Sequence, residues 1–374
     1  MTAVNVIALT QQLVSMDSVN PPGNEAALSE YIGNLLAGNG FEVDMIPYDE
    51  NRSHLIAKKG NPVKKPVVFS GHLDTVPLGE MPWTVAPFSG KIKEDKIYGR
   101  GTSDMKGGVA AMVVAAIRAT QQNPDASVCL IFTAGEETGC QGAAHLVKNY
   151  PDLGAARGII IGEPTANIPA IGHKGGLYLK VTAKGKPAHS SMPHLGDNAI
   201  YKAAEAVLKL KKFIFHKNED SLLGLPTLNI GKFRGGINLN AVPDHAEFTI
   251  DVRTTTKSNH AQLLNQFKQL AGRDLTFETL VDLPAVASDE NDAFVQLVYS
   301  ACGISKAEKG FPKAMPYLTD GTVLQSAYIG APTIILGPGQ LEMAHKTDEF
   351  CYIKKIEEAV EIYTQIILEG ETLQ

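Results

Sequence analysis

The sequence of 374 residues has only four cysteines and a single tryptophan. The cysteines, Cys129, Cys140, Cys302 and Cys351, include no Cys-x-x-Cys pair, which argues against a disulfide framework or a thiolate-rich structural zinc site. We therefore expect free thiols in a reducing compartment. No stretch approaches the roughly 18 consecutive apolar residues of a membrane span, and the amino terminus lacks a basic segment followed by an apolar core. These absences predict a cytoplasmic protein without a membrane partner.

Positive charge is not in excess either. Lysine and arginine number 34 against 40 aspartates and glutamates, which gives a formal net charge of -6 at pH 7. A broad basic surface for nucleic acid is therefore not expected. Hydrophobic residues make up 44% and charged residues 20%, which is typical of a globular protein with large buried cores. The length favours two domains over one.

Two kinds of hydrophobic pattern divide the chain. In its first part, short apolar runs are typical of strands buried on both faces of a parallel sheet: 67–69, 128–132 and 158–161. After residue 174, apolar and polar residues alternate as in strands with one solvent face, at 177–182, 246–253 and 275–283. We predict an α/β domain with a mostly parallel sheet, formed by residues 1–174 and 285–374. An α+β domain of residues 175–284, with helices expected at 199–212 and 260–271, is inserted into it.

Polar side chains follow the buried strands, where open α/β sheets place their ligand sites. His72 and Asp74 lie two residues apart, so an extended backbone points both to the same side. A carboxylate there could receive the second ring N–H of a metal-bound imidazole. A structural histidine in a strand-end turn is the alternative.

Asp104 stands among glycines, in the sequence GRGTSDMKGG, directly before an expected buried helix of 105–120. It could cap that helix, which is a common use of aspartate. A phosphate loop is disfavoured because the GxxxxGK[ST] spacing is absent. A carboxylate in a tight loop can also bridge two cations.

Further candidates for a metal site are Glu136, Glu137, Glu163 and His345. Two adjacent acids at the end of an apolar strand need solvent, protons or metal ions, because buried like charges repel. Solvated loop acids and a surface histidine are the alternatives. Nitrogen and oxygen ligands without thiolates favour zinc, cobalt or manganese over a cysteine-rich site.

With these motifs in place, the chain resembles the M20 metallopeptidase family, and within it the acetylornithine deacetylase and succinyl-diaminopimelate desuccinylase group. The resemblance extends from Ser18 to Glu349 and rests on ordered motifs: GHLDTVP, GRGTSDMKGG, TAGEETG, GEPT, KGKPAHSSMP and GPGxxxxAH. It implies a dinuclear zinc hydrolase domain with an inserted ferredoxin-like lid and dimerisation domain.

The same resemblance implies a role for each candidate residue. Two zinc ions per subunit, replaceable by cobalt or manganese, would share five ligands: His72 and Glu163 on one ion, Glu137 and His345 on the other, and Asp104 as the bridge. Asp74 would be the partner of His72, and Glu136 the general base that activates a water between the metals. A cis peptide bond would follow Asp104.

In the inserted domain, the motif around His189 implies an oxyanion donor that reaches the active site of a partner subunit, and hence a homodimer. Whether His189 acts within its own subunit or across the dimer stays open. Asn240 and Arg253 match substrate-binding positions, since a guanidinium suits a substrate carboxylate. Structural hydrogen bonding is the alternative for both. The loop 319–322 is a further candidate to face the substrate.

These features predict an amidohydrolase that removes the acyl group from a small N-acyl amino acid, with acetylornithine-type deacetylation first. Succinyl-diaminopimelate desuccinylase, dipeptidase and glutamate carboxypeptidase activities use the same chemistry and are alternatives. A non-catalytic small-molecule binding protein is the alternative from another class, and a purely structural dimer is a further one. The complete set of expected ligands together with Glu136 argues against both.

Overall fold

The computed structural model describes residues 4–215, 219–272, 274–304 and 313–373. The chain divides into two compact units. The large unit comprises Met1–Gly172, Ala287–Met315 and Thr319–Gln374, and the inserted unit comprises His173–Val286 and Pro316–Leu318. The predicted boundaries of the insertion, 175 and 284, lie two residues inside this division, and the prediction did not include Pro316–Leu318.

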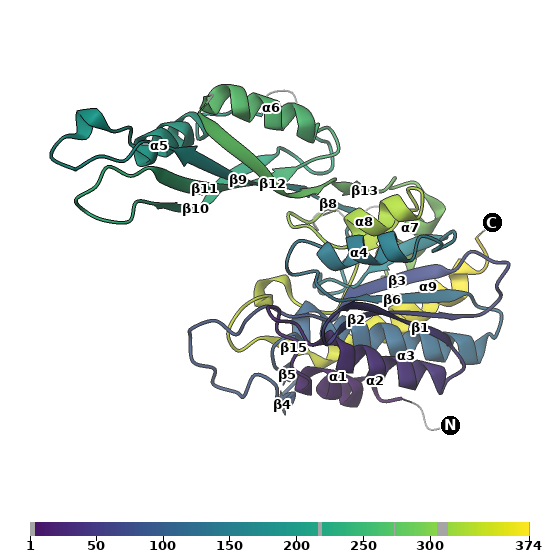
Figure 1. Ribbon diagram of the computed structural model, residues 1–374. Coiled ribbons are helices and arrows are strands. Elements are labelled where there is room, and N and C mark those ends of the chain that lie inside the picture. Colours follow the sequence, from purple (N-terminus) through teal and green to yellow (C-terminus); the bar gives the residue numbers. More distant parts are fainter. Residues whose placement is uncertain (1–3, 216–218, 273, 305–312, 374) are drawn as a thin grey trace. The chain divides into compact units, whose positions relative to one another are not determined.

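A six-stranded mixed sheet forms the centre of the large unit (Figure 1). Its strands follow the order β1 (Glu42–Asp49), β2 (Arg52–Lys59), β6 (Val128–Thr133), β3 (Val67–His72), β7 (Gly158–Ile161) and β14 (Thr333–Ile335). The last four run parallel, whereas β1 and β2 pair in antiparallel fashion at one edge. The prediction of a mostly parallel sheet is thereby confirmed.

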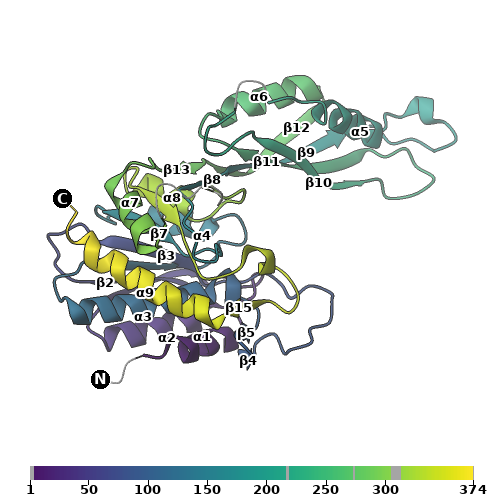
Figure 2. The same cartoon turned by 180° about the vertical axis from the view of Figure 1, so that it is seen from behind.

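Helices cover both faces of this sheet, which explains why its central strands are continuous apolar runs. One face carries α1 (Val6–Ser15), α2 (Glu25–Ala37), α3 (Gly107–Gln122) and α9 (Ile353–Gly370), and α7 (Ala293–Ala301) packs against α9. The opposite face carries α4 (Gln141–Asn149) and α8 (Gly321–Ala327) (Figures 1 and 2). Successive residues of β3 point to opposite sides: Val68 packs with Leu146 of α4 and Leu324 of α8, whereas Phe69 contacts Tyr363 of α9.

Several short elements complete the large unit. A three-stranded sheet joins β15 (Phe350–Tyr352), β5 (Lys96–Tyr98) and β4 (Lys91–Lys93). Two helical turns lie near the strand ends, η1 (Thr102–Lys106) and η3 (Leu341–Met343), and β8 (Gly172–His173) pairs with β13 (Val286–Ala287) where the chain passes between the units. The pairing of β15 with β5 brings two segments that are about 250 residues apart in sequence side by side.

The inserted unit is a four-stranded antiparallel sheet with two helices on one face (Figure 2). In chain order its elements are β9 (Gly175–Lys184), η2 (Pro193–Leu195), α5 (Ala199–Leu210), β10 (Thr227–Gly235), β11 (His245–Thr254), α6 (His260–Ala271) and β12 (Leu275–Leu283). The strand order β10-β11-β9-β12 and the βαββαβ succession are those of a ferredoxin-like fold. Leu179, Phe248 and Phe267 lie in its core, on the face that the helices cover.

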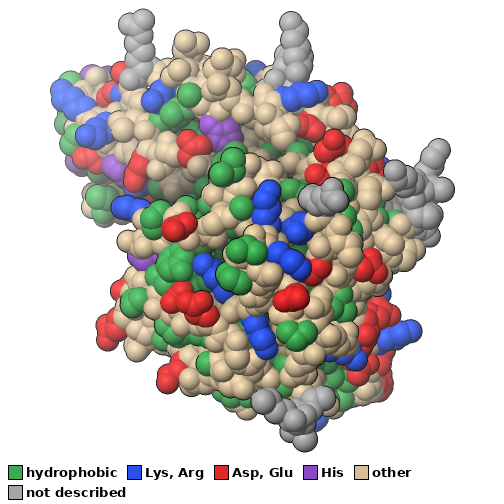
Figure 3. Space-filling model, turned by 90° about the vertical axis from the view of Figure 1, so that its right-hand side faces the viewer, with side chains coloured by type: hydrophobic (Ala, Val, Ile, Leu, Met, Phe, Trp, Pro, Cys, Tyr) green, Lys and Arg blue, Asp and Glu red, His purple; other side chains and the backbone are tan. Residues whose placement is uncertain are grey.

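The surface carries charges of both signs. Lysine and arginine side chains lie beside acidic ones on the face drawn in Figure 3, in keeping with the small formal charge of -6. Among the described residues, no helix combines the length and the apolar character that crossing a membrane requires.

Candidate metal centre

The predicted ligands gather at one edge of the central sheet. His72 is the last residue of β3, Glu137 follows β6, and Glu163 follows β7. Because these strands are parallel, their carboxyl ends lie at the same edge. The loop after β14 brings His345 to this edge, and Asp104 arrives in the turn before α3.

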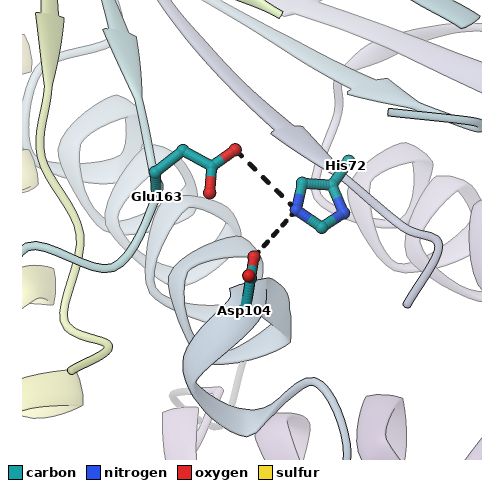
Figure 4. A group of neighbouring side chains, drawn as sticks. All are labelled: His72, Asp104 and Glu163. Atoms are coloured by element: carbon teal, nitrogen blue, oxygen red, sulfur yellow. Dashed lines mark hydrogen bonds and ion pairs between the residues drawn. The ribbon is translucent and has the colours of Figure 1, made fainter. Parts of the chain in front are cut away.

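The first group of ligands is buried. His72 Nε2 lies 3.0 Å from Asp104 Oδ1 and 3.8 Å from Glu163 Oε1. Figure 4 shows both carboxylates directed at the same ring nitrogen of His72. The exposed fractions of His72, Asp104 and Glu163 are only 2%, 8% and 6%.

The second group shares Asp104 with the first. His345 Nε2 lies 3.4 Å from Asp104 Oδ2 and 3.2 Å from Glu137 Oε2. Asp104 therefore offers one oxygen to each histidine. Within each group the candidate ligand atoms lie within 4.8 Å of one another, so each group is compact enough to hold one ion.

The pKa values show how strongly burial and neighbouring groups act on these side chains. Burial and the charge of Asp104 raise the pKa of Glu137, and the same two causes raise that of Glu163 well above its usual range. Burial alone would also raise the pKa of Asp104, but hydrogen bonds with His345 and His72 hold it well below its usual range. Hydrogen bonds to Asp104 and Glu137 raise the pKa of His345 to about 10.

Unused hydrogen-bonding capacity also fits a metal. Among the residues that the structure describes, Glu137 Oε1 is buried and has no hydrogen-bond partner. A buried carboxylate oxygen without a donor is costly. The donor set of imidazoles and carboxylates is the one that zinc, cobalt and manganese accept. The residues present therefore fit two metal ions.

The backbone around Asp104 is irregular, and the peptide bond between Asp104 and Met105 is cis, as the family resemblance implied. The alternative role of Asp104 as the cap of the following helix is not what the structure shows. Helix α3 begins only at Gly107, with Lys106 in the capping position. The expected helix of 105–120 thus starts two residues late, because the turn at Asp104 and Met105 departs from helical geometry.

Asp74 contacts His72 differently from the prediction. The Nδ1 atom of His72 lies 2.9 Å from the main-chain oxygen of Asp74 and 3.6 Å from its carboxylate. The carboxylate instead accepts the backbone N–H groups of Gly135, Glu136 and Glu137, together with the side-chain amide of Asn20. Asp74 therefore holds the loop that carries the proposed base.

Two residues that the sequence motifs do not connect with Glu136 lie beside its carboxylate. The Cys140 thiol donates to Glu136 Oε1 at 3.3 Å, and Asp320 offers a third ligand atom within 4.8 Å of both. Thr133 Oγ1 donates to Asp320 at 2.5 Å. Burial and the charge of Glu163 raise the pKa of Glu136 well above its usual range. The loop 319–322, which contains Asp320, is a predicted candidate to face the substrate. The only sequence signal that connects Cys140 with Glu136 is their spacing of four residues.

The remaining predicted site residues belong to the inserted unit. His189 is exposed, and its Nδ1 atom lies 2.8 Å from Ser191 Oγ. Asn240 is also exposed, and its main-chain oxygen accepts from Ser190. Arg253 Nε lies 2.9 Å from Asp251 Oδ1, and its guanidinium stacks over Tyr178.

Comparison with known proteins now decides the family. The profile of peptidase family M20/M25/M40 matches residues 68–369. The chain belongs to this family. As an M20 protein it is a metal-dependent hydrolase of amide bonds.

M20 relatives cover nearly the whole chain. A probable succinyl-diaminopimelate desuccinylase of Staphylococcus epidermidis is 33% identical over an alignment of 384 positions, which covers 92% of each chain. An acetylornithine deacetylase of Vibrio vulnificus is 29% identical and covers 95% of this chain and 94% of its own. The fold of this M20 protein matches that of an M20 metallo-carboxypeptidase from Sulfolobus solfataricus with a TM-score of 0.81, at 19% identity and 99% and 100% coverage. A dinuclear metal-binding M20 peptidase of Bacillus subtilis matches with a TM-score of 0.71, at 17% identity and 98% coverage of both chains.

Proposed function

We propose that this protein hydrolyses the amide bond of a small N-acyl amino acid at a centre of two zinc ions, for which cobalt or manganese can substitute. The observation that supports this most strongly is the position of Asp104. One carboxylate oxygen lies 3.0 Å from His72 and the other 3.4 Å from His345, so that a single side chain spans two compact groups of ligands. Shared carboxylates suit paired metal ions.

Two metal ions in these positions would lower the pKa of water and polarise the amide carbonyl. Glu136 is the proposed general base. It is adjacent to the ligand Glu137 but belongs to neither ligand group with Asp104. Glu136 Oε1 accepts a hydrogen bond from the Cys140 thiol, which leaves Oε2 to take a proton from water and return it to the departing amine. The Asp74 carboxylate holds the backbone of this loop in place during both transfers.

The inserted unit would supply the remaining contacts. His189 is the proposed donor to the oxyanion, and its exposure leaves it accessible to a second subunit. We also propose a homodimer. Exposed apolar side chains of the inserted unit support it, because a partner would cover them: Tyr201 (68%), Leu208 (60%), Ile237 (92%) and Leu239 (102%). Asn240 and Arg253 are the proposed substrate contacts, and Arg253 would exchange Asp251 for a substrate carboxylate.

The substrate is proposed as a class, an N-acyl amino acid. Relatives named desuccinylase and deacetylase are 33% and 29% identical to this chain, so both N-succinyl-diaminopimelate and N-acetylornithine are candidates. A panel of these two compounds, simple N-acetyl amino acids and dipeptides distinguishes them. Turnover of dipeptides alone would favour a peptidase, and two bound metals without any turnover would favour a binding protein.

The variant Glu136→Gln tests the proposed base. It should retain the metal content of the wild type, because Glu136 is not a proposed ligand, while kcat falls by roughly 10²–10⁴-fold. The matched control is Glu30→Gln, a change of the same kind at an exposed position of α2. A Glu136→Gln enzyme with nearly wild-type kcat would exclude this role.

His189→Ala tests the oxyanion donor. We expect kcat to fall by roughly 10²–10³-fold with the metal content unchanged. The neighbouring His194 is also exposed and has no proposed role, so His194→Ala serves as the control. Equal rates for the two variants would contradict the proposal.

A further inference from the structure

A buried ion pair lies behind the metal centre. The guanidinium of Arg100 and the carboxylate of Glu349 are 1% and 0% exposed, and Arg100 Nη1 lies 2.7 Å from Glu349 Oε2. Neither residue is among the proposed ligands or substrate contacts. A buried ion pair contributes little net stability by itself, so its other contacts indicate what it does.

Glu349 accepts the backbone N–H groups of the turn that carries Asp104. Its Oε1 atom accepts from Ser103 at 2.8 Å and from Asp104 at 3.0 Å, and its Oε2 atom accepts from Gly101 at 2.9 Å. Three backbone donors within four residues thus converge on one carboxylate, as in the anion-binding nests of other loops. The turn at Asp104 is built around the side chain of Glu349.

The same pair connects this turn to the loop of the second histidine. Glu349 lies four residues after His345, and Arg100 Nη1 also donates to the main-chain oxygen of Lys346 at 3.2 Å. Ser103 Oγ donates to the main-chain oxygen of Phe350 at 2.7 Å. The segments that carry Asp104 and His345 are therefore held together by hydrogen bonds that involve no metal.

We propose that Glu349, held by Arg100, is a positioning residue for the metal centre. It fixes the backbone at Asp104, and with it the spacing between the Asp104 carboxylate and the His345 ring, before metal binds. Outer hydrogen-bond partners of this kind typically change metal affinity by 10- to 100-fold when they are removed. The inference rests on the proposed role of Asp104 as the shared ligand.

The variant Glu349→Gln removes one acceptor oxygen and places an amide donor against backbone donors. The control is Glu25→Gln, because Glu25 is also fully buried and pairs with an arginine, Arg52, but accepts none of the hydrogen bonds of the Asp104 turn. Apo-protein of each variant is titrated with Co²⁺ in competition with a chelator, and the visible absorption of bound cobalt is recorded. We expect Glu349→Gln to bind cobalt at least about tenfold more weakly, with a changed spectrum, and Glu25→Gln to match the wild type.

Wild-type affinity and spectrum in Glu349→Gln would overturn the proposal, and so would an equal loss in Glu25→Gln, which would indicate general destabilisation. If Glu349→Gln does not fold, the double variant Arg100→Gln/Glu349→Gln, which buries no unpaired charge, takes its place under the same criteria. Binding of two cobalt ions by the wild type tests the proposed function separately. Its failure would contradict both proposals, whereas failure of the Glu349 comparison alone leaves the proposed function intact.

Discussion

The contacts of Cys140 indicate a role in the reaction that differs from the usual role of a reactive cysteine. Its thiol is buried and donates to Glu136 Oε1 at 3.3 Å. Burial raises the pKa of this thiol well above its usual range, and the neighbouring charge of Glu136 adds to the effect. The neutral thiol is therefore a hydrogen-bond donor and not a nucleophile.

Replacing Cys140 tests this donor. Cys140→Ala should lower kcat roughly fivefold, which corresponds to about 1 kcal/mol for one lost hydrogen bond. Cys140→Ser keeps a donor and should lose less. Steady-state kinetics of the two variants, with metal content measured in parallel, gives the comparison. Equal kcat values in serine and alanine variants would show that the donor is unimportant.

At the scale of helices and strands, the hydrophobic periodicity was a reliable guide where one face of an element packs against a core. The stretch 260–271 is α6, the run 275–283 is β12, and 199–212 contains α5 with its end two residues earlier. These elements are confirmed because each packs one apolar face against a single core.

Other elements were not predicted, for a physical reason. The strands β1 and β2 at one edge of the large sheet, and the three-stranded sheet of β4, β5 and β15, each depend on one pairing between distant segments: β2 pairs with β6, and β15 pairs with β5. The alternation of residues along one segment does not encode its pairing partner. The start of α2 shows the same limit: asparagine is a preferred capping residue and Asn24 is in the capping position, but its side chain makes no capping hydrogen bond.

Strand β2 carries a histidine that should make stability depend on pH. His54 is fully buried and accepts the backbone N–H of Ala134, and burial together with the charges of His145 and Arg52 lowers its pKa to about 3. In the unfolded chain its pKa is near 6.5. As the pH falls below about 6.5, the unfolded state therefore binds this proton before the native state does. The free energy of unfolding falls with pH until the pH reaches the pKa of the folded state.

When the pH is lowered from 7.5 to 5.5, protonation of His54 in the unfolded state should lower the free energy of unfolding by about 1.4 kcal/mol. Urea denaturation at both values measures this loss in the wild type and in His54→Gln. The variant is less stable overall, but it should lose about 1.4 kcal/mol less between the two pH values. His194→Gln, at an exposed position, should keep the wild-type difference. An unchanged pH dependence in His54→Gln would contradict the assignment.

At the scale of the whole molecule, seven of the predicted site residues lie in the large unit, and three, His189, Asn240 and Arg253, lie in the inserted unit. The core of the inserted unit is built from its own side chains. Phe248→Ala should therefore destabilise that unit by roughly 3–5 kcal/mol without changing the metal content. Chemical denaturation and metal analysis of the same sample measure both effects, and loss of metal in the folded variant would show that the centre depends on the inserted unit.

Much of the candidate site could be predicted, because strand ends and residue types are visible in the sequence. The structure brings His72, Asp104, Glu137, Glu163 and His345 together at one sheet edge. The contacts of Asp74 and Glu349 with backbone N–H groups could not be predicted. They depend on the direction of individual peptide groups in tight turns, which side-chain spacing does not specify.

The central claim is that Asp104 joins two metal positions, and the metal-to-protein ratio tests it most directly. We expect two zinc ions per wild-type chain after reconstitution and removal of excess metal. In an Asp104→Ala variant that circular dichroism shows to be folded, we expect fewer than one. A wild-type ratio of one or zero, or a ratio of two that persists in Asp104→Ala, would contradict the account.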